Sequence, residues 1–223
     1  IRNDALTEEA LRITEGWPAA LWLSVQSYKK SGRFAAGKDV EDLLYTTVYR
    51  HYTREEKSVL LQLSQLESFT LEQADFICAN DNAKAHVMTF CSSNAFISYD
   101  KLNNNYRMHS LFRGLLLSLL GKNNDPDTKN IDMPSLYRRC GEHFWRNEDF
   151  IQAVRFFRKA GTPDDLLQIL RIMAQPTDGT IVMFAPEEMF HTFQAIPWEI
   201  RLRCPIGYLA FVYYYLSRIS VKK

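Results

Sequence analysis

The fold of this chain is decided by residues 95–120, which read AFISYDKLNNNYRMHSLFRGLLLSLL. Residues 95–99 have the character of a short strand, residues 101–105 have the asparagine-rich chemistry of a tight turn, and residues 106–108 return as a second strand. Residues 111–120 then place apolar side chains at helical spacing. We therefore expect a β-hairpin that runs directly into a helix.

The helices that precede the hairpin complete a winged helix, which we place at residues 37–122. Two of them begin with capping boxes, in which a threonine and the glutamate or glutamine three residues later satisfy each other's backbone N–H groups. The capping pairs are Thr53 with Glu56 and Thr70 with Gln73. A further helix is expected over about residues 81–92, so that three helices lead into the hairpin.

The flanks of the winged helix are expected to be helical as well. Residues 1–36 carry two stretches with apolar side chains at helical spacing. Residues 123–130, NNDPDTKN, are too polar to support a packed element and predict a linker. Residues 131–223 form helix pairs with a partial tetratricopeptide pattern, in which small residues let helices approach and aromatic side chains fill the gaps. That pattern consists of Tyr137, Gly141, Phe144, Phe150, Ala153, Phe157 and Ala160. The expected fold class is therefore mainly α: a helical subdomain, a winged helix with a small β-hairpin, and tetratricopeptide-like repeats.

Composition and charge argue against several classes of protein. The 27 basic residues are nearly balanced by 26 acidic ones, so the basic excess of a nucleic-acid-binding domain is missing. The four cysteines are far apart and form no CxxC pair, which favours free thiols in a reducing cytosol. The longest apolar run, residues 206–216, is too short to span a bilayer, and no signal peptide opens the chain. We expect a cytoplasmic segment without membrane or direct nucleic-acid contact, cut from a longer protein at both ends.

Two short motifs are candidates for ligand binding. His109 opens the helix after the hairpin, where free N–H groups and a partial positive charge would let an imidazole donate to a phosphate. Taken alone, a capping or surface histidine explains the same position. Gly16-Trp17-Pro18 stands where a helix begins, since proline suits the first helical position. Taken alone, a helix–helix turn with a packed tryptophan explains that motif.

Other motifs carry no chemistry that we expect to be used. Residues 32–39, GRFAAGKD, nearly match the phosphate loop GxxxxGK[ST], but a polar helix precedes them and Asp39 replaces the hydroxyl. We interpret them as a linker and a helix cap. The five histidines lack zinc-site spacing, and no nucleophile motif is present. Neither a metal site nor an enzyme is therefore expected.

In order and spacing, three features together resemble a known family. They are residues 15–21, EGWPAAL; a winged helix that ends in residues 106–116, YRMHSLFRGLL; and the tetratricopeptide-like helices after it. This arrangement resembles the large ATP-binding LuxR-type transcriptional regulators of the maltose-regulon-activator kind, which are signal-transduction ATPases with numerous domains. Such regulators often have His-His-Leu-Phe-Arg-Asp at the second motif, where this chain has Ser110 for the second histidine and Gly114 for the aspartate.

The resemblance implies a cofactor, ATP or ADP, in the intact parent protein. It implies that Pro18 lies against the adenine, with Gly16 and Trp17 shaping the turn. It also implies that His109 contacts the nucleotide phosphate in an ADP-bound resting state. The phosphate loop and the magnesium carboxylates would lie outside this chain, so we expect no tight nucleotide binding by this chain alone.

The resemblance further implies an internal segment of a bacterial, ATP-dependent, signal-responsive transcription regulator. Residues 1–36 would end a helical ATPase subdomain, and residues 131–223 would begin a sensor arm. The partners would be the parent's ATPase and DNA-binding domains, a small-molecule inducer or regulatory protein on the arm, and possible further copies of the protein. Two alternatives stay open: a helical-repeat interaction scaffold without a nucleotide role, and a stand-alone winged-helix DNA-binding protein. The second is disfavoured because the helix at residues 81–92 offers only Lys84 and His86 as basic side chains.

Overall fold

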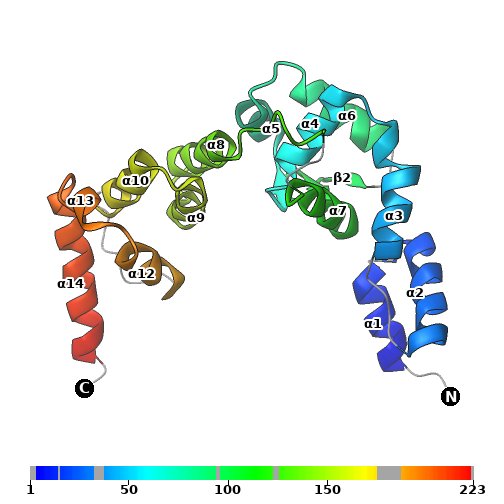
Figure 1. The fold of residues 1–223 in the computed structure, drawn as a ribbon, viewed down its shortest axis with the longest axis horizontal. Helices are drawn as coiled ribbons and strands as arrows, with labels where there is room; N and C mark the ends of the chain where they lie inside the picture. The colour runs from blue at the N-terminus through cyan, green and yellow to red at the C-terminus, as the bar shows by residue number, and fades with distance from the viewer. Residues whose placement is uncertain are drawn as a thin grey trace. The chain divides into compact units, whose positions relative to one another are not determined.

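The computed structural model describes residues 4–14, 16–32, 38–93, 96–122, 126–174 and 187–221. The chain is mainly helical and divides into two units, Ile1–Ile131 and Asp132–Lys223 (Figure 1). The elements of unit 1 are α1 (Asp4–Thr14), α2 (Pro18–Ser31), α3 (Lys38–Thr47), the 3-10 helix η1 (Tyr49–His51), α4 (Arg54–Leu63), β1 (Ser68–Phe69), α5 (Leu71–Cys78), α6 (Ala83–Ser93), β2 (Ile97–Asp100), β3 (Asn105–Met108) and α7 (Ser110–Leu120). Those of unit 2 are α8 (Met133–Arg146), α9 (Phe150–Ala160), α10 (Pro163–Met173), α12 (Glu187–Gln194), α13 (Trp198–Arg201) and α14 (Pro205–Val221).

The order of elements from α4 to β3 is that of a winged helix, and α4 is its central helix. Five successive residues, from Val59 to Leu63, are buried, so the second half of α4 is covered on every side. The capping boxes predicted at Thr53 and Thr70 are both confirmed, at the starts of α4 and α5. Burying a large apolar side chain stabilises a fold by about 1.5–3 kcal/mol. The largest fully buried side chains of this unit include Tyr49, Phe69, Ile77, Phe90, Ile97, Phe112 and Leu116.

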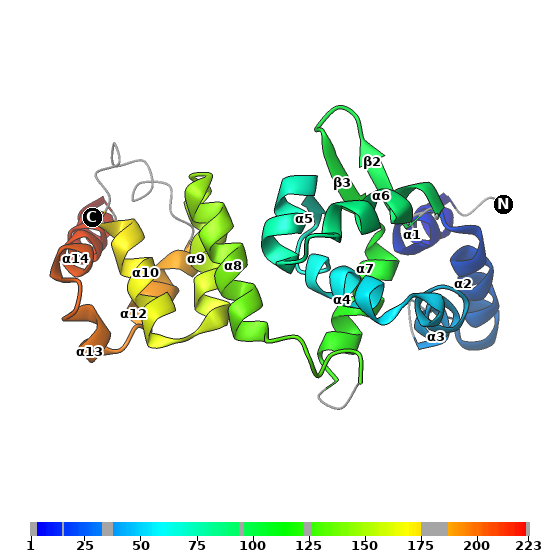
Figure 2. The ribbon, with the colours of Figure 1, turned by 90° about the horizontal axis from the view of Figure 1, so that it is seen from above.

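The predicted hairpin is present as β2 and β3, and its tip projects from the helices (Figure 2). A third strand, β1, adds to the other edge of β3, which gives the antiparallel order β1-β3-β2. The sequence did not indicate β1, because a strand of two residues has no measurable period. At the hairpin tip the Asp100 carboxylate accepts hydrogen bonds from the Leu102 and Asn103 N–H groups, at 2.9 and 3.3 Å.

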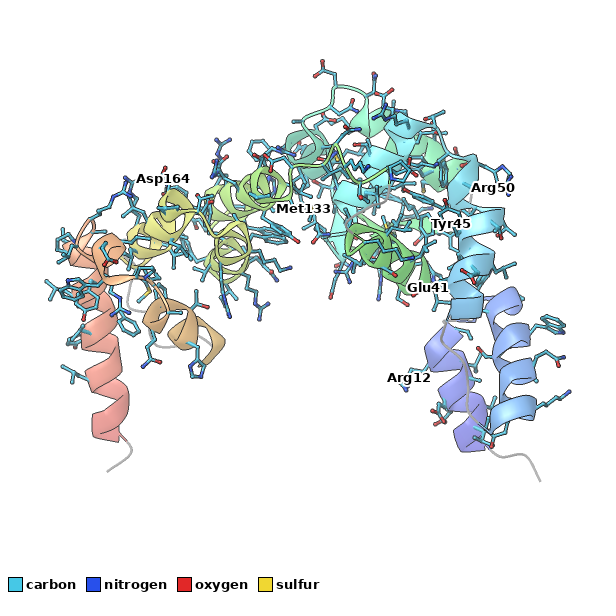
Figure 3. All side chains as sticks on the ribbon, viewed as in Figure 1. Arg12, Glu41, Tyr45, Arg50, Met133 and Asp164 are labelled. Atoms are coloured by element: carbon cyan, nitrogen blue, oxygen red, sulfur yellow. The ribbon has the colours of Figure 1, made fainter. Side chains whose placement is uncertain are left out.

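Helix α3 ends earlier than its sequence pattern predicted. It stops at Thr47, whose hydroxyl donates to the Leu43 carbonyl at 2.6 Å, and the chain then turns through η1. Tyr49 lies in this turn and is completely buried. A continued α3 would carry the Tyr49 side chain in a different direction. Helix α3 also contacts α7, where the Ser118 hydroxyl donates to the Glu41 carboxylate at 3.4 Å. Figure 3 labels Glu41 on α3.

In unit 2, α8 and α9 pack as the tetratricopeptide pattern predicted. Gly141 is buried, and a Cβ atom added there would lie 2.9 Å from Cδ1 of the Phe157 ring. The helices can therefore approach this closely only because position 141 has no side chain. Phe144 stacks on Phe156, with ring centroids 5.5 Å apart and planes at 5°. Aromatic rings thus fill the space on either side of the glycine.

A second glycine joins α14 to α10. A Cβ atom on Gly207 would lie 2.1 Å from the Leu170 carbonyl oxygen, so the two backbones are in direct contact there. Phe211 follows on the same helix and is buried in the unit 2 core. Helix α14 also carries exposed apolar side chains at spacings of three and four residues, namely Ile206, Leu209, Tyr213 and Leu216.

An ion pair between a partly exposed arginine and a buried aspartate connects α8 to α10. Arg138 donates from Nε and Nη2 to the two carboxylate oxygens of Asp165, at 2.8 and 3.1 Å, and Asp165 is 1% exposed. Burial by itself would raise the pKa of the Asp165 carboxyl. The hydrogen bonds from Arg138 and Thr162 outweigh that effect and hold the pKa below its usual value.

The four cysteines are free thiols, and Cys78 and Cys140 are buried. Burial raises the pKa of the Cys140 thiol to about 12, so this thiol stays protonated and unreactive. The helices seen in the described part of the chain include none that combines the length and apolar character needed to cross a membrane.

We predict that Gly141→Ala destabilises unit 2 by about 1–3 kcal/mol, because the added methyl group forces the buried Phe157 ring to move. Chemical denaturation followed through Trp145, whose ring lies edge-on to Phe157, measures the change. Gly114→Ala is the contrast: position 114 lies in the middle of α7 with nothing within 4 Å of an added Cβ. That substitution should stabilise unit 1 by about 0.5–1 kcal/mol. If both substitutions changed the free energy of unfolding by the same amount and in the same direction, the close packing at Gly141 would be contradicted.

We predict that Asp165→Asn destabilises unit 2 by about 1–3 kcal/mol at neutral pH. The carboxyl's folded pKa lies below the value of about 3.9 expected for the unfolded chain. The pair therefore stabilises unit 2 fully above that value, and this stabilisation is lost as the pH falls through the folded pKa. Chemical denaturation at pH 7, 5 and 3 measures the free energy of unfolding. Between pH 7 and pH 3 this free energy should fall less in Asp165→Asn than in the parent chain.

Asp164→Asn is the matched control for that experiment. Asp164 is the neighbouring residue, labelled in Figure 3, and its side chain is 78% exposed beside Arg203. A surface pair of this kind contributes about 0–1 kcal/mol. If Asp164→Asn and Asp165→Asn had the same effect, burial of Asp165 would not be the reason for the strength of its pair.

Candidate functional site

The Gly16-Trp17-Pro18 motif forms the turn between α1 and α2. Gly16 has a φ of +76°, in the left-handed region that favours glycine. Trp17 then begins α2 as its N-cap, with Pro18 in the first turn as the sequence predicted. The Trp17 N–H donates to the Thr14 carbonyl at 2.9 Å, which closes the turn. Gly16 and Pro18 are exposed, and the Trp17 ring is half-buried.

His109 is the N-cap of α7. Its Nδ1 accepts a hydrogen bond from the Leu111 N–H at 3.3 Å, as a capping side chain does. A neutral imidazole that accepts at Nδ1 carries its proton on Nε2, so this bond assigns the tautomer. Nε2 is therefore a hydrogen-bond donor. The capping role considered from sequence is confirmed.

Phe96 connects the two motifs, and sequence reasoning missed it. Its carbonyl accepts the His109 N–H at 2.7 Å. Its ring meets the Trp17 ring edge-on at 5.3 Å and the His109 ring edge-on at 5.9 Å, measured between centroids. The ring also contacts Phe112 of α7 at 5.2 Å, and Phe96 is 7% exposed. Trp17 and His109, far apart in the sequence, thus pack on the same buried ring.

The N-terminus of α7 favours an anion. Its first turn contains no acidic residue, so no side-chain carboxylate there offsets the partial positive charge of the helix end. The Arg113 guanidinium, one turn further along, donates to the Ser64 carbonyl at 2.8 Å and lies 3.8 Å from Glu67. Ser110 and Gly114, at which this chain departs from the family pattern, are both exposed. An imidazole beside a helix N-terminus is an arrangement that is chemically suited to a phosphate group.

The basic side chains of α6, the helix considered for DNA reading, are engaged within the protein. Lys84 forms an ion pair with Asp75 at 2.8 Å. His86 stacks on Phe90 and lies 3.6 Å from Glu55. The side-chain amides of Asn82 and Asn80 donate hydrogen bonds to the Glu55 carboxylate, at 3.2 Å each, and these hydrogen bonds lower the pKa of Glu55. Helix α6 therefore offers little positive charge to a DNA backbone.

One sequence motif can be placed only in part. The phosphate-loop-like stretch at residues 32–39 lies mostly outside the described residues, since residues 33–37 are not among them. Among the residues that the structure does describe, no group of histidine, cysteine, aspartate or glutamate side chains could hold a metal ion.

Comparison with known proteins supports the architecture. Residues 45–129 match the family model of the MalT winged helix domain. The crystal structure of a signal transduction ATPase with numerous domains (STAND) protein with a tetratricopeptide repeat sensor, from Pyrococcus horikoshii, matches with a TM-score of 0.58. The identity is 17%, the match covers 94% of this chain, and this chain spans 29% of that one. No curated protein matches. The fold is therefore similar to that of MalT and STAND-type regulators, as the sequence indicated, while the LuxR-type assignment remains a prediction.

We predict that His109→Ala destabilises unit 1 by about 1 kcal/mol, because the cap on Leu111 is lost. His109→Asn should cost less, since asparagine is a preferred N-cap residue. Thermal unfolding monitored by circular dichroism measures both variants. Equal loss of stability in the two variants would mean that the His109 side chain stabilises the fold by its ring contact with Phe96 rather than by its cap.

Proposed function

We propose that this chain is an internal segment of an ATP-dependent, signal-responsive transcription regulator of the STAND type, and that it senses which nucleotide the parent protein holds. The observation that carries the proposal is the packing of Trp17 and His109 on the ring of Phe96. It brings together the two motifs that the family resemblance associates with nucleotide. In this role the segment binds and signals, and it catalyses no reaction of its own.

The donor set fits the phosphate of ADP. The Nε2–H of His109 would donate to a phosphate oxygen, and the N-terminus of α7 would add its partial positive charge. Pro18, exposed at the first turn of α2, would lie against the adenine, with Gly16 and Trp17 holding the turn in place. The phosphate loop and magnesium ligands would come from the rest of the parent protein. Bound nucleotide would thus contact both the α1–α2 turn and the winged helix.

Nucleotide state would act through the relative stability of two packings. ADP bridging the turn and His109 would favour the closed arrangement in which both motifs rest on Phe96. An inducer or regulatory protein on the helical arm, together with exchange of ADP for ATP, would favour a second arrangement competent for self-association and promoter binding. A ligand shifts such an equilibrium only by its difference in affinity for the two states.

The test uses the full-length parent protein, purified with the nucleotide that it retains. We predict that His109→Ala and His109→Asn both weaken ADP binding about ten- to hundredfold, the effect of losing one hydrogen bond to a charged group. Chromatography of the nucleotide released by acid, together with titration of ADP, measures the effect. Because His109→Asn retains a capping side chain, its loss of ADP would not follow from destabilisation of α7.

Thr53→Ala is the matched control. It removes a comparable N-cap at the start of α4 and should cost about 1 kcal/mol of stability. ADP retention should not change, because Thr53 belongs to neither motif. Unchanged ADP affinity in both His109 variants, with unchanged basal promoter activity, would sink the role proposed for His109.

A second candidate is a helical-repeat scaffold without a nucleotide role. The row of exposed apolar side chains on α14 favours it, since Ile206 and Tyr213 are 69% and 76% exposed. Partner binding that is equally strong with ATP, with ADP and without nucleotide would support the scaffold. A stand-alone DNA-binding protein has no such observation in its favour, and a mobility shift at modest salt would test it.

A further inference from the structure

The segment that follows α7 is attached to the winged helix. Residues 123–130 looked like a free linker in the sequence, but residues 126–130 form turns and Asp127 is half-buried. The Asp127 carboxylate lies 3.2 Å from the Lys57 ammonium, and the two side chains are 19% and 15% exposed. An ion pair that is mostly withdrawn from water is screened less than a surface pair. This mostly buried ion pair therefore attaches Asp127 to α4.

Lys57 is itself held in position. It lies one residue beyond the capping box of α4, and its N–H donates to the Thr53 carbonyl at 3.0 Å. Its ammonium also sits over the ring of Tyr49, 5.2 Å from the centroid. Tyr49 is fully buried in η1. The Asp127 carboxylate therefore pairs with the Lys57 ammonium, which lies where the chain turns from α3 through η1 into α4.

Unit 2 begins immediately after this attached segment. The Ile131 N–H donates to the Thr128 carbonyl at 3.0 Å, which keeps residues 128–131 in a turn. Asp132 is the N-cap of α8: its carbonyl accepts the Leu136 N–H at 2.9 Å, and its carboxylate accepts the Ser135 hydroxyl. Met133, labelled in Figure 3, is the first residue of that helix. The backbone between residues 131 and 132 is where one unit's contacts end and the other's begin.

We propose that the Lys57–Asp127 ion pair is a strap that fixes the connector to the winged helix, so that the helical arm pivots at the junction of residues 131 and 132. While the strap is closed, movement of the arm acts directly on the corner between α3 and α4. When the ion pair is broken, residues 126–131 become a flexible connector and the two units move independently. This inference is independent of the nucleotide role proposed for His109.

The first measurement is hydrogen–deuterium exchange on this chain, resolved to the peptide that contains residues 126–131. Asp127→Asn should raise its exchange about tenfold and leave peptides from α4 unchanged. Lys57→Met should raise exchange of the same peptide, and the effects of the two substitutions should not add, because both remove the Lys57–Asp127 ion pair. Asp75→Asn is the control: it breaks the exposed Lys84–Asp75 pair in the same unit and should leave this peptide unchanged.

The second measurement tests the pivot by small-angle X-ray scattering. Asp127→Asn should broaden the set of arrangements needed to fit the scattering curve, whereas Asp75→Asn should not. The double variant Lys57→Asp with Asp127→Lys exchanges the two charges. It should restore slow hydrogen exchange in residues 126–131 and the narrower set of arrangements that fits the parent's scattering curve. Unchanged exchange in Asp127→Asn would overturn the strap. Raised exchange with an unchanged scattering curve would overturn the pivot, because the arm would then be held by other contacts.

Discussion

The hydrogen bond from the His109 N–H to the Phe96 carbonyl joins the N-cap of α7, just after the hairpin, to the residue just before the hairpin. It closes the base of the β2–β3 hairpin and sets where α7 begins. With the base closed, the Phe96 ring is held against Phe112, and its other edge is presented to Trp17. Through the Phe96 ring, this backbone contact helps to place the α1–α2 turn on the winged helix. The two motifs meet because both contact that ring.

Unit 2 is organised by a different constraint, the absence of side chains at two helix crossings. Gly141 admits the Phe157 ring, and Gly207 admits the backbone of Leu170. Close approach increases the dispersion contacts between helices and excludes water, which is how repeat helices without a large common core become stable. The pair of Arg138 and Asp165 adds a directional contact, and it also specifies which helices can meet.

Several basic side chains of unit 1 are paired with acidic side chains of the same unit. Lys84, Arg113 and Lys57 each have an acidic partner within unit 1. The near balance of 27 basic and 26 acidic residues agrees with this use. These pairs reduce the positive charge that the winged helix offers to the phosphate backbone of DNA. The start of α7, with no acid in its first turn, is a place where electrostatic attraction for an anion remains.

Local pattern in the sequence determined the helices, both capping boxes, the hairpin and the close packing at Gly141, because each depends on residues near one another in the chain. It also picked out Trp17 and His109, through the order of two short motifs. It could not determine that Phe96 joins them, since a phenylalanine beside a strand looks like any core residue. Nor could it show the two-residue strand β1 or the pairing of Asp127 with Lys57, which turns an apparent linker into part of a unit. These features were decided by the tertiary structure, because they depend on contacts between residues distant in the sequence, and such contacts leave no periodicity in a single chain.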